Sequence, residues 1–272
     1  MKITFIGGGN MAGAMIGGLI SQGFAASDLF VVEPDQGRRN QLAQEYGLAT
    51  GAPDQPLPAS DVVIFAVKPQ QLRQVAQTAA PQLAGALALS IAAGVRVDTL
   101  SRWLGGYARV VRVMPNTPAL VQAGISGVFA AEGVSAEDRA AVDRILASIG
   151  KVVWLKDESE MDGITAISGS GPAYVFYFIE SLQAAARAQG FAPDIARELA
   201  YETVAGAMKL AAQSDDDAAT LRIKVTSKGG TTERAINAMD NSQVRATIIA
   251  ATQAAAARSR ELGDELGRDT EA

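Results

Sequence analysis

The chain has 272 residues, of which 48% are hydrophobic and 19% charged, and its formal net charge is −5. This length suggests two domains, the composition excludes a disordered chain, and the negative charge offers no basic field for nucleic acid or acidic lipid. There is no cysteine and no histidine, which excludes disulfides, thiolate nucleophiles, cysteine-ligated zinc and imidazole catalysis. We therefore expect no metal site, and chemistry that depends on a cofactor or on other side chains.

No apolar run is long enough to span a membrane, because the run over residues 83–95 is short and is followed by Arg96. The chain enters a strand at once and lacks the charged-then-apolar pattern of a secretion signal. We expect a cytoplasmic protein without a membrane partner.

The opening of the chain predicts a strand, a glycine turn and a helix. Residues 3–6 are mostly apolar, residues 7–9 are all glycine, and apolar residues then recur at helical spacing. The spacing Gly7-x-Gly9-x-x-Ala12 is that of dinucleotide-binding turns, in which free N–H groups at the helix start hold a pyrophosphate. The alternative is a turn with a purely structural role.

A second predicted strand, residues 29–32, ends at Glu33, which lies 33 − 12 = 21 positions after Ala12. This is close to the ~20 positions expected for an acid that accepts hydrogen bonds from the adenine ribose of NAD and repels the extra phosphate of NADP. Arg38 and Arg39 follow closely and could instead bind that phosphate. The alternative is that Glu33, Arg38 and Arg39 are simply exposed to solvent and bind no cofactor. This segment therefore leaves the choice between NAD and NADP open.

Residues 61–67 form a largely apolar run that predicts a buried parallel strand, and Lys68-Pro69 ends it. Lys68 should therefore lie at the carboxyl edge of the sheet, where ligands bind in open α/β folds, unless it is simply a solvated lysine. Small-residue and proline-flanked turns follow two later strands, at Ala92-Ala93-Gly94 and at Asn116-Thr117. The predicted strands are residues 86–91, 109–113, 125–130 and 151–155, and the predicted helices are residues 71–79 and 135–148. This alternation predicts a doubly wound sheet.

Beyond residue 157 no strand-like run remains, and helical segments take over. Residues 173–179 are apolar nearly all round, so this helix must be covered on every side. The chain after residue 157 is only ~115 residues long, and a domain of that length can hardly bury such a helix alone. We therefore expect an obligate homodimer with interlocked helices. The alternative is a central helix buried within its own domain. Further helices are predicted over residues 193–212 and 243–262, which gives domains 1–157 and 158–272.

A second anion-binding turn is predicted between these helices. Gly229-Gly230 offers free N–H groups, and Thr231 or Thr232 is a natural cap for the helix that follows. A carboxylate would fit this turn without an arginine, while the alternative is an ordinary glycine connection between helices.

The chain resembles the pyrroline-5-carboxylate reductases over essentially its whole length. The resemblance rests on residues 5–12 (FIGGGNMA), 66–69 (AVKP), 90–94 (SIAAG), 114–118 (MPNTP), 168–174 (SGSGPAY) and 225–232 (VTSKGGTT). The last is the family's signature segment and is more specific than the glycine turn. Many members carry proline where this chain has Lys228, a variable position.

The resemblance implies a Rossmann-type doubly wound sheet followed by an all-α dimerisation domain. It implies hydride transfer from NADPH, with NADH as the alternative, to the C=N bond of 1-pyrroline-5-carboxylate, which gives L-proline in the last step of proline biosynthesis. It also implies dimers, often assembled further into decamers. The implied cofactor-binding residues are Gly7, Gly9, Asn10, Met11, Ala12, Ala66, Val67, Lys68, Pro69, Ala92, Ala93 and Asn116, and Glu33 joins them on its spacing from the glycine turn. The implied substrate-binding residues are Val225, Ser227, Gly229, Gly230, Thr231 and Thr232.

Such a reaction would explain the missing histidine, because a cyclic imine can bring its own proton as an iminium. Our hypothesis is that the Thr232 hydroxyl is the catalytic group that hydrogen-bonds the ring nitrogen, while backbone N–H groups of residues 230–232 bind the carboxylate. Glu33 departs from the small polar residue of many NADPH-preferring members, which points to dual use or a shift toward NADH. Cofactor preference, assembly beyond a dimer and feedback inhibition by proline stay open.

Two rival functions remain. The β-hydroxyacid dehydrogenases share the two-domain plan but need a lysine acid on the interdomain helix, and residues 168–180 contain none. The other rival is a nucleotide-sensing protein that binds without turnover, which the intact substrate turn disfavours.

Overall fold

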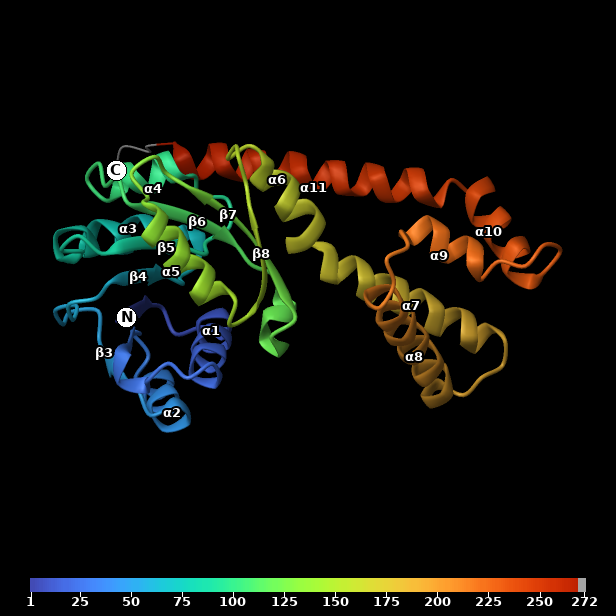
Figure 1. The fold of residues 1–272 in the computed structure, drawn as a ribbon, viewed down its shortest axis with the longest axis horizontal. Helices are drawn as coiled ribbons and strands as arrows, with labels where there is room; N and C mark the ends of the chain where they lie inside the picture. Colours follow the sequence, from blue (N-terminus) through green and yellow to red (C-terminus); the bar gives the residue numbers. More distant parts are fainter. Residues whose placement is uncertain (269–272) are drawn as a thin grey trace. The chain divides into compact units, whose positions relative to one another are not determined.

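A computed structural model describes residues 1–268, and these form two compact units (Figure 1). The sheet unit comprises residues 1–170 together with the chain from Ala255 onward, and the helical unit is Gly171–Ala254. The predicted division instead falls after residue 157, and residues 269–272 at the end of its second domain lie outside the described chain. The segment between the two boundaries holds helix α6 (Glu160–Ile164) and a π-helical turn (Thr165–Gly169).

The sheet unit is built on one eight-stranded sheet with the order β3-β2-β1-β4-β5-β6-β7-β8. Its strands are β1 (Ile3–Ile6), β2 (Leu29–Val32), β3 (Ala49–Gly51), β4 (Val62–Phe65), β5 (Leu87–Ser90), β6 (Val110–Met114), β7 (Gly124–Ala130) and β8 (Gly150–Trp154). Strands β1 to β6 are parallel. Their order, 3-2-1-4-5-6, is that of doubly wound dinucleotide-binding sheets, so the predicted fold class is confirmed.

The last two strands run against the others. Strand β7 is antiparallel to β6, and β8 is parallel to β7. Between β6 and β7 lies only the short 3₁₀ helix η3 (Thr117–Val121), and a parallel pair would need a longer crossover. Helix α5 (Ala136–Leu146) supplies that crossover between β7 and β8, and it begins with a capping box formed by Ser135 and Asp138.

Helices cover both faces of the sheet. They are α1 (Asn10–Ser21), α2 (Gln36–Tyr46), α3 (Pro69–Ala79), α4 (Val97–Trp103) and α5, with the 3₁₀ turns η1 (Ala26–Asp28) and η2 (Ala80–Gln82). Successive residues of a strand point to opposite faces. Phe5 accordingly joins one buried cluster with Met15 of α1, whereas Ile6 joins a second with Leu72 of α3. The sheet is therefore buried on both faces, as its apolar strands predict.

The helical unit contains α7 (Gly171–Ala188), α8 (Pro193–Ala212), α9 (Ala218–Lys224), α10 (Thr231–Asn241) and the first part of α11 (Val244–Gly267). The described chain has no strand after β8, which agrees with the predicted change to helices. Helix α9 was not predicted. The predicted threonine cap of α10 is wrong, because Gly230 is the N-cap and Thr231 and Thr232 are the first two helical residues.

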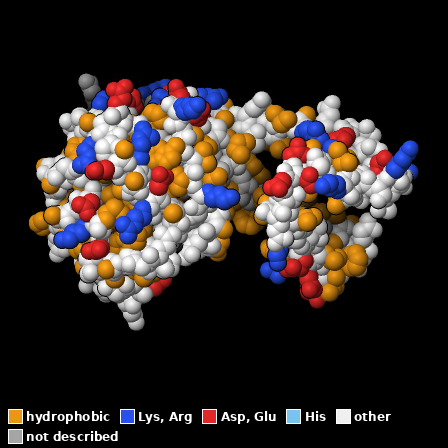
Figure 2. All heavy atoms as spheres, viewed as in Figure 1, with side chains coloured by type: hydrophobic (Ala, Val, Ile, Leu, Met, Phe, Trp, Pro, Cys, Tyr) orange, Lys and Arg blue, Asp and Glu red, His pale blue; other side chains and the backbone are white. Residues whose placement is uncertain are grey.

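Large apolar side chains of the helical unit lie at its surface (Figure 2). On α7, Phe176 is 63% exposed and Tyr177 is 72% exposed. One copy of the chain therefore leaves much of this helix uncovered. Among the described helices, none is long and apolar enough to cross a lipid bilayer.

Candidate active site

The first glycine turn connects β1 to α1 and places its glycines in different environments. Gly7 has φ +102°, and a Cβ there would lie 2.5 Å from the carbonyl oxygen of Ala66. Glycine is therefore required for the backbone itself. Gly9 has φ −68°, and a Cβ there would meet nothing within 4 Å. The space beside Gly9 is open to a ligand.

Helix α1 begins with unpaired N–H groups at this opening. Gly9 is its N-cap, no side chain caps it, and its first turn carries no acid. The hydrogen bond from Gly13 N to Gly9 O, at 2.9 Å, leaves Asn10, Met11 and Ala12 without acceptors among the described residues. Free N–H groups at the start of a helix bind anions such as phosphate.

Glu33 follows β2 and faces the same turn. Its Oε2 accepts a hydrogen bond from Gly8 N at 2.8 Å, and its Oε1 accepts one from Asp35 N at 3.0 Å. A Cβ on Gly8 would lie 2.7 Å from Leu42 Cδ1 and 3.3 Å from Glu33 Oε2. Gly8 is thus a site residue that the Gly7-x-Gly9 spacing missed, although three glycines in a row signal it.

The two arginines after β2 hold the backbone around this turn. Arg38 Nε donates to Gly8 O at 2.6 Å, and Arg39 Nη1 donates to Glu33 O at 2.6 Å and to Pro34 O at 2.8 Å. One side-chain N–H of each arginine is therefore engaged by the backbone of this turn. Neither arginine is paired with the Glu33 carboxylate, which accepts from the backbone N–H groups of Gly8 and Asp35.

A cavity of about 620 Å³ opens beside the turn and extends along α3. Its volume lies within the roughly 300–1,000 Å³ of typical ligand pockets. Gln71, Gln74 and Thr78 of α3 line it together with Glu33 and Val67. These three residues of α3 were not predicted to line a site, although the spacing of Gln71, Gln74 and Thr78 places them on one face of a helix.

The ends of β4, β5 and β6 carry the other predicted cofactor residues. Lys68 caps α3 after β4, and its exposed ammonium has no partner within residues 1–268. Ala92 follows β5, and its N–H donates to Ser90 Oγ at 3.2 Å. Because these strands are parallel neighbours, their carboxyl ends lie at one edge of the sheet. The remaining predicted residues Ala66, Val67, Pro69 and Ala93 lie at the same strand ends.

Asn116, in the loop after β6, is buried, and both ends of its side-chain amide are hydrogen-bonded. Its Nδ2 donates to Ser168 O at 3.1 Å, and its Oδ1 accepts from Ile125 N at 2.9 Å. The side chain thus ties the loop after β6 to Ser168 and Ile125.

The second predicted turn lies in the helical unit, between α9 and α10. Gly229 has φ +73°, and its N–H donates to Glu233 Oε2 at 2.7 Å, while Gly230 N donates to Ser227 O at 3.0 Å. The exposed residues Thr231 and Thr232 have N–H and hydroxyl groups without partners in the described chain. The open donors of this turn are therefore those of the two threonines rather than those of the glycines.

The predicted cofactor residues are thus gathered at one edge of the sheet unit, and the predicted substrate residues, Val225 included, in one turn of the helical unit. The sheet unit combines a strand, a glycine turn with unpaired N–H groups and an acid at the end of the second strand. Together these features define a dinucleotide-binding protein. The sheet unit is that of a nicotinamide-dinucleotide oxidoreductase.

Comparisons with known proteins agree with this class and narrow it. Residues 2–94 match the family "NADP oxidoreductase coenzyme F420-dependent", and residues 158–262 match "Pyrroline-5-carboxylate reductase dimerisation". The chain is 39% identical over 269 residues to a pyrroline-5-carboxylate reductase of Pseudomonas aeruginosa, covering 98% of each chain. It is 41% identical over 268 residues to that of Pasteurella multocida, covering 96% of this chain and 97% of the relative.

Solved structures show the same likeness. The pyrroline-5-carboxylate reductase of Coxiella burnetii superposes with a TM-score of 0.91 at 38% identity, covering 96% of this chain and 98% of that one. The Plasmodium falciparum pyrroline carboxylate reductase with NADP bound has a TM-score of 0.83 at 28% identity, covering 97% and 98%. The chain belongs to the pyrroline-5-carboxylate reductase family.

Proposed function

We propose that this chain reduces the C=N bond of 1-pyrroline-5-carboxylate with NAD(P)H and so forms L-proline. The observation that carries the proposal is a pair of open N–H sites, at the starts of α1 and α10, in a chain without histidine or cysteine. One site suits a pyrophosphate and the other a carboxylate. The likeness to the Pseudomonas, Pasteurella and Coxiella enzymes supports the substrate.

The residues of the sheet unit fit a nicotinamide dinucleotide. The open space beside Gly9 admits a pyrophosphate to the N–H groups of residues 10–12. Glu33 would accept hydrogen bonds from the adenine ribose, and Lys68 with the turn after β5 would surround the nicotinamide ribose. When bound, the dinucleotide supplies the hydride, and the chain only has to hold it in place.

The substrate turn needs to supply alignment rather than strong acid catalysis. The N–H groups of Thr231 and Thr232 would hold the carboxylate, and the Thr232 hydroxyl would hydrogen-bond the ring nitrogen. The iminium already carries its proton on nitrogen. Hydride addition to carbon therefore moves the C=N electron pair onto nitrogen and gives the neutral secondary amine. A threonine hydroxyl is too weak an acid to donate the proton itself.

The exposed apolar side chains of α7 support an obligate homodimer through the helical unit, with a decamer as a higher assembly of such dimers. We place the nicotinamide-binding domain at residues 1–157 and the substrate and dimerisation domain at residues 158–272. The reaction consumes reduced dinucleotide, which supports a cytoplasmic location.

The direct test mixes purified protein with 1-pyrroline-5-carboxylate and NADPH or NADH and follows loss of the reduced nicotinamide absorbance. Thr232→Ala should lower kcat/KM for the imine roughly ten- to a hundredfold, the value of one hydrogen bond of about 1–3 kcal/mol. Thr252→Ala, at a partly exposed threonine of α11, is the matched control and should leave kcat/KM unchanged.

The outcomes separate the rival functions. An unchanged kcat/KM in Thr232→Ala would remove this residue from the mechanism while the activity stands. Cofactor binding without any turnover of the imine would favour the nucleotide-sensing protein. Oxidation of β-hydroxyacids is not expected, because α7 (Gly171–Ala188) carries no lysine.

A further inference from the structure

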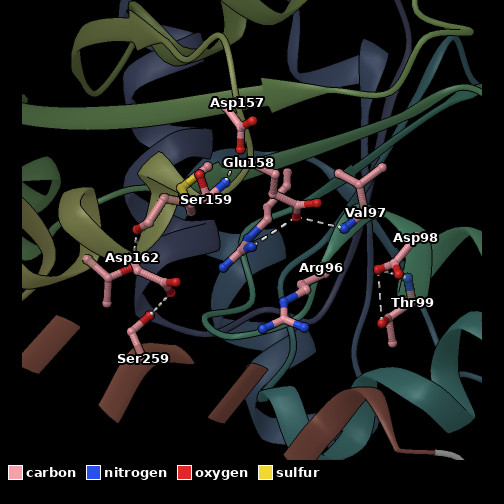
Figure 3. Close-up of polar contacts among 12 residues, drawn as sticks. Arg96, Val97, Asp98, Thr99, Asp157, Glu158, Ser159, Asp162 and Ser259 are labelled. Atoms are coloured by element: carbon pink, nitrogen blue, oxygen red, sulfur yellow. Dashed lines mark hydrogen bonds and ion pairs between the residues drawn. The ribbon is translucent and has the colours of Figure 1, made fainter. Parts of the chain in front are cut away.

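A carboxylate outside the predicted site joins two of its loops. Glu158 lies between β8 and α6 and points toward the start of α4 (Figure 3). Its Oε1 accepts a hydrogen bond from Val97 N at 2.8 Å and another from Arg112 Nη1 at 2.9 Å. One oxygen thus connects a residue of α4 with a residue of β6.

The connection is buried and charged. The Arg112 side chain is only 6% exposed and that of Glu158 21% exposed. A buried guanidinium without a partner is strongly disfavoured, so the ion pair fixes the orientation of the carboxylate. The carboxylate in turn supplies the acceptor for Val97 N, because α4 has no side-chain cap of its own.

Both partners of Glu158 border the part of the edge where a nicotinamide would lie. In this strand order the adenosine half of a dinucleotide lies over β1, β2 and β3, and the nicotinamide half lies over β4, β5 and β6. Val97 ends the turn that starts with Ala92 after β5. Arg112 lies on β6, paired with Ser90 of β5, just before the strand ends at Met114.

The same turn is packed from another side by the end of α11, which belongs to the sheet unit. Arg96 Nη2 pairs with Asp264 Oδ1 at 2.6 Å, and a Cβ on Gly94 would lie 3.2 Å from Leu266 Cδ1. Gly94 has φ +79°, a conformation that favours glycine. The turn is thus a fixed structure, and Glu158 holds its last residue.

We propose that Glu158 is a positioning residue that sets the nicotinamide half of the cofactor through Val97 and Arg112, while the adenosine half depends on other contacts. The inference rests on the proposed function only in that a nicotinamide dinucleotide binds at this edge. It predicts a split between ligands: a loss of NADH binding without a loss of ADP-ribose binding, since ADP-ribose lacks the nicotinamide.

The experiment measures the dissociation constants of NADH and ADP-ribose by calorimetry, together with kcat and KM, for the full-length protein. Glu158→Gln keeps the size of the side chain but removes its charge. It should weaken NADH binding by about tenfold, while ADP-ribose binding changes by less than about twofold. Asp138→Asn is the matched control, because it breaks the Arg109–Asp138 pair near the opposite end of β6. Asp138→Asn should leave the dissociation constants of both NADH and ADP-ribose unchanged.

A second variant removes the other half of the contact. Val97→Pro deletes the N–H that Glu158 accepts and leaves the ion pair intact, and proline is tolerated because Val97 is the first helical residue and Arg96 is extended. Val97→Pro should likewise weaken NADH binding without weakening ADP-ribose binding. It tests the proposal on its own if Glu158→Gln fails to fold. Equal losses for NADH and ADP-ribose, or no change in either, would overturn the proposal. Wild-type protein that binds NADH but does not reduce the imine would refute the proposed function and leave this inference standing.

Discussion

The two units of this chain differ in how far one copy can bury its own apolar residues. In the sheet unit, strands and helices enclose two continuous clusters that include Phe5, Met15, Phe65 and Leu72. In Gly171–Ala254, the buried hydrophobic residues are only Ile179, Ala196 and Ala200.

This difference shows which part of the molecule a single chain can stabilise. Burial of apolar surface is the main favourable term in folding, so the sheet unit has what it needs within one chain. The helical unit exposes the kind of aromatic surface that proteins bury against a partner. The sheet unit with its proposed cofactor edge is thus packed within one chain, whereas we expect the unit that carries the proposed substrate turn to depend on association.

The largest expected effect is on association. Phe176→Glu puts a charge on the exposed aromatic face of α7 and should weaken dimerisation roughly 30- to 1,000-fold, as for a hot spot of about 2–4 kcal/mol. Sedimentation velocity across a concentration series checks it. Gln213→Glu, at the exposed end of α8, adds the same charge and should leave the mass of the sedimenting assembly unchanged. If Phe176→Glu sediments with the same assembly mass as the wild type, this face of α7 is not the interface. The inference that the helical unit needs a partner to cover it would then be wrong.

The next effect separates fold from ligand within the sheet unit. Gly7→Ala should cost about 1–3 kcal/mol through backbone strain alone, and more through the contact with Ala66 O, so Tm should fall. Gly9→Ala should keep Tm, because its Cβ meets nothing, but should weaken NAD(P)H binding by about tenfold where the pyrophosphate approaches. Thermal unfolding and cofactor titration on both variants test this. The same change in Tm for both would mean that the turn is not preformed.

A third prediction concerns cofactor choice. Glu33→Ser removes the carboxylate at the end of β2 and should shift the ratio of kcat/KM for NADH over NADPH toward NADPH by about tenfold. Steady-state kinetics with both cofactors measure it, and Glu45→Ser on the exposed face of α2 is the control. A wild-type protein that already favours NADPH strongly would show that Glu33 does not govern the choice.

The smallest effect is a pH dependence of the sheet unit. Burial opposes ionisation of Asp138, but hydrogen bonds from Arg109 and Ser135 outweigh it and lower the pKa of this carboxyl group. A lowered folded pKa stabilises the fold above the unfolded pKa of about 3.9, and this contribution is lost as pH falls toward the folded value. Asp138→Asn should therefore cost about 1 kcal/mol at pH near 7 and much less in acid. Urea unfolding at both pH values checks it, and a constant difference would contradict the assignment.

Regular elements with a clear apolar pattern could be predicted from the sequence. The strands around Phe5, Ile64 and Val111 and the helix from Pro193 to Ala212 are found where periodicity places them. Strand β3 was missed because Ala49–Gly51 has neither length nor apolar alternation. The direction of β7 was missed because it depends on how little chain separates it from β6.

The candidate site was predictable where backbone geometry demands a residue type and not where a side chain has to choose a partner. Gly7 could be recognised because only glycine tolerates its conformation. Nothing in the sequence shows that Asn116 binds Ser168 O, or that Glu158 reaches across to Val97 N and Arg112. Such contacts join residues far apart in the chain, so local patterns carry no signal for them.

Helix α11 is continuous from Val244 to Gly267, and its first part lies in one unit and its last part in the other. Each residue of a helix advances the phase by about 100°. Ser259 of this last part donates to Asp162 Oδ1 at 2.6 Å, so inserting or deleting one residue between Ser259 and Gly263 would rotate Leu266 and Asp264 away from Gly94 and Arg96 without altering a single side chain. The spacing between Ser259 and Leu266 is consequently under tighter constraint than the identities of the residues between them, and natural variation in length should be absent from this segment.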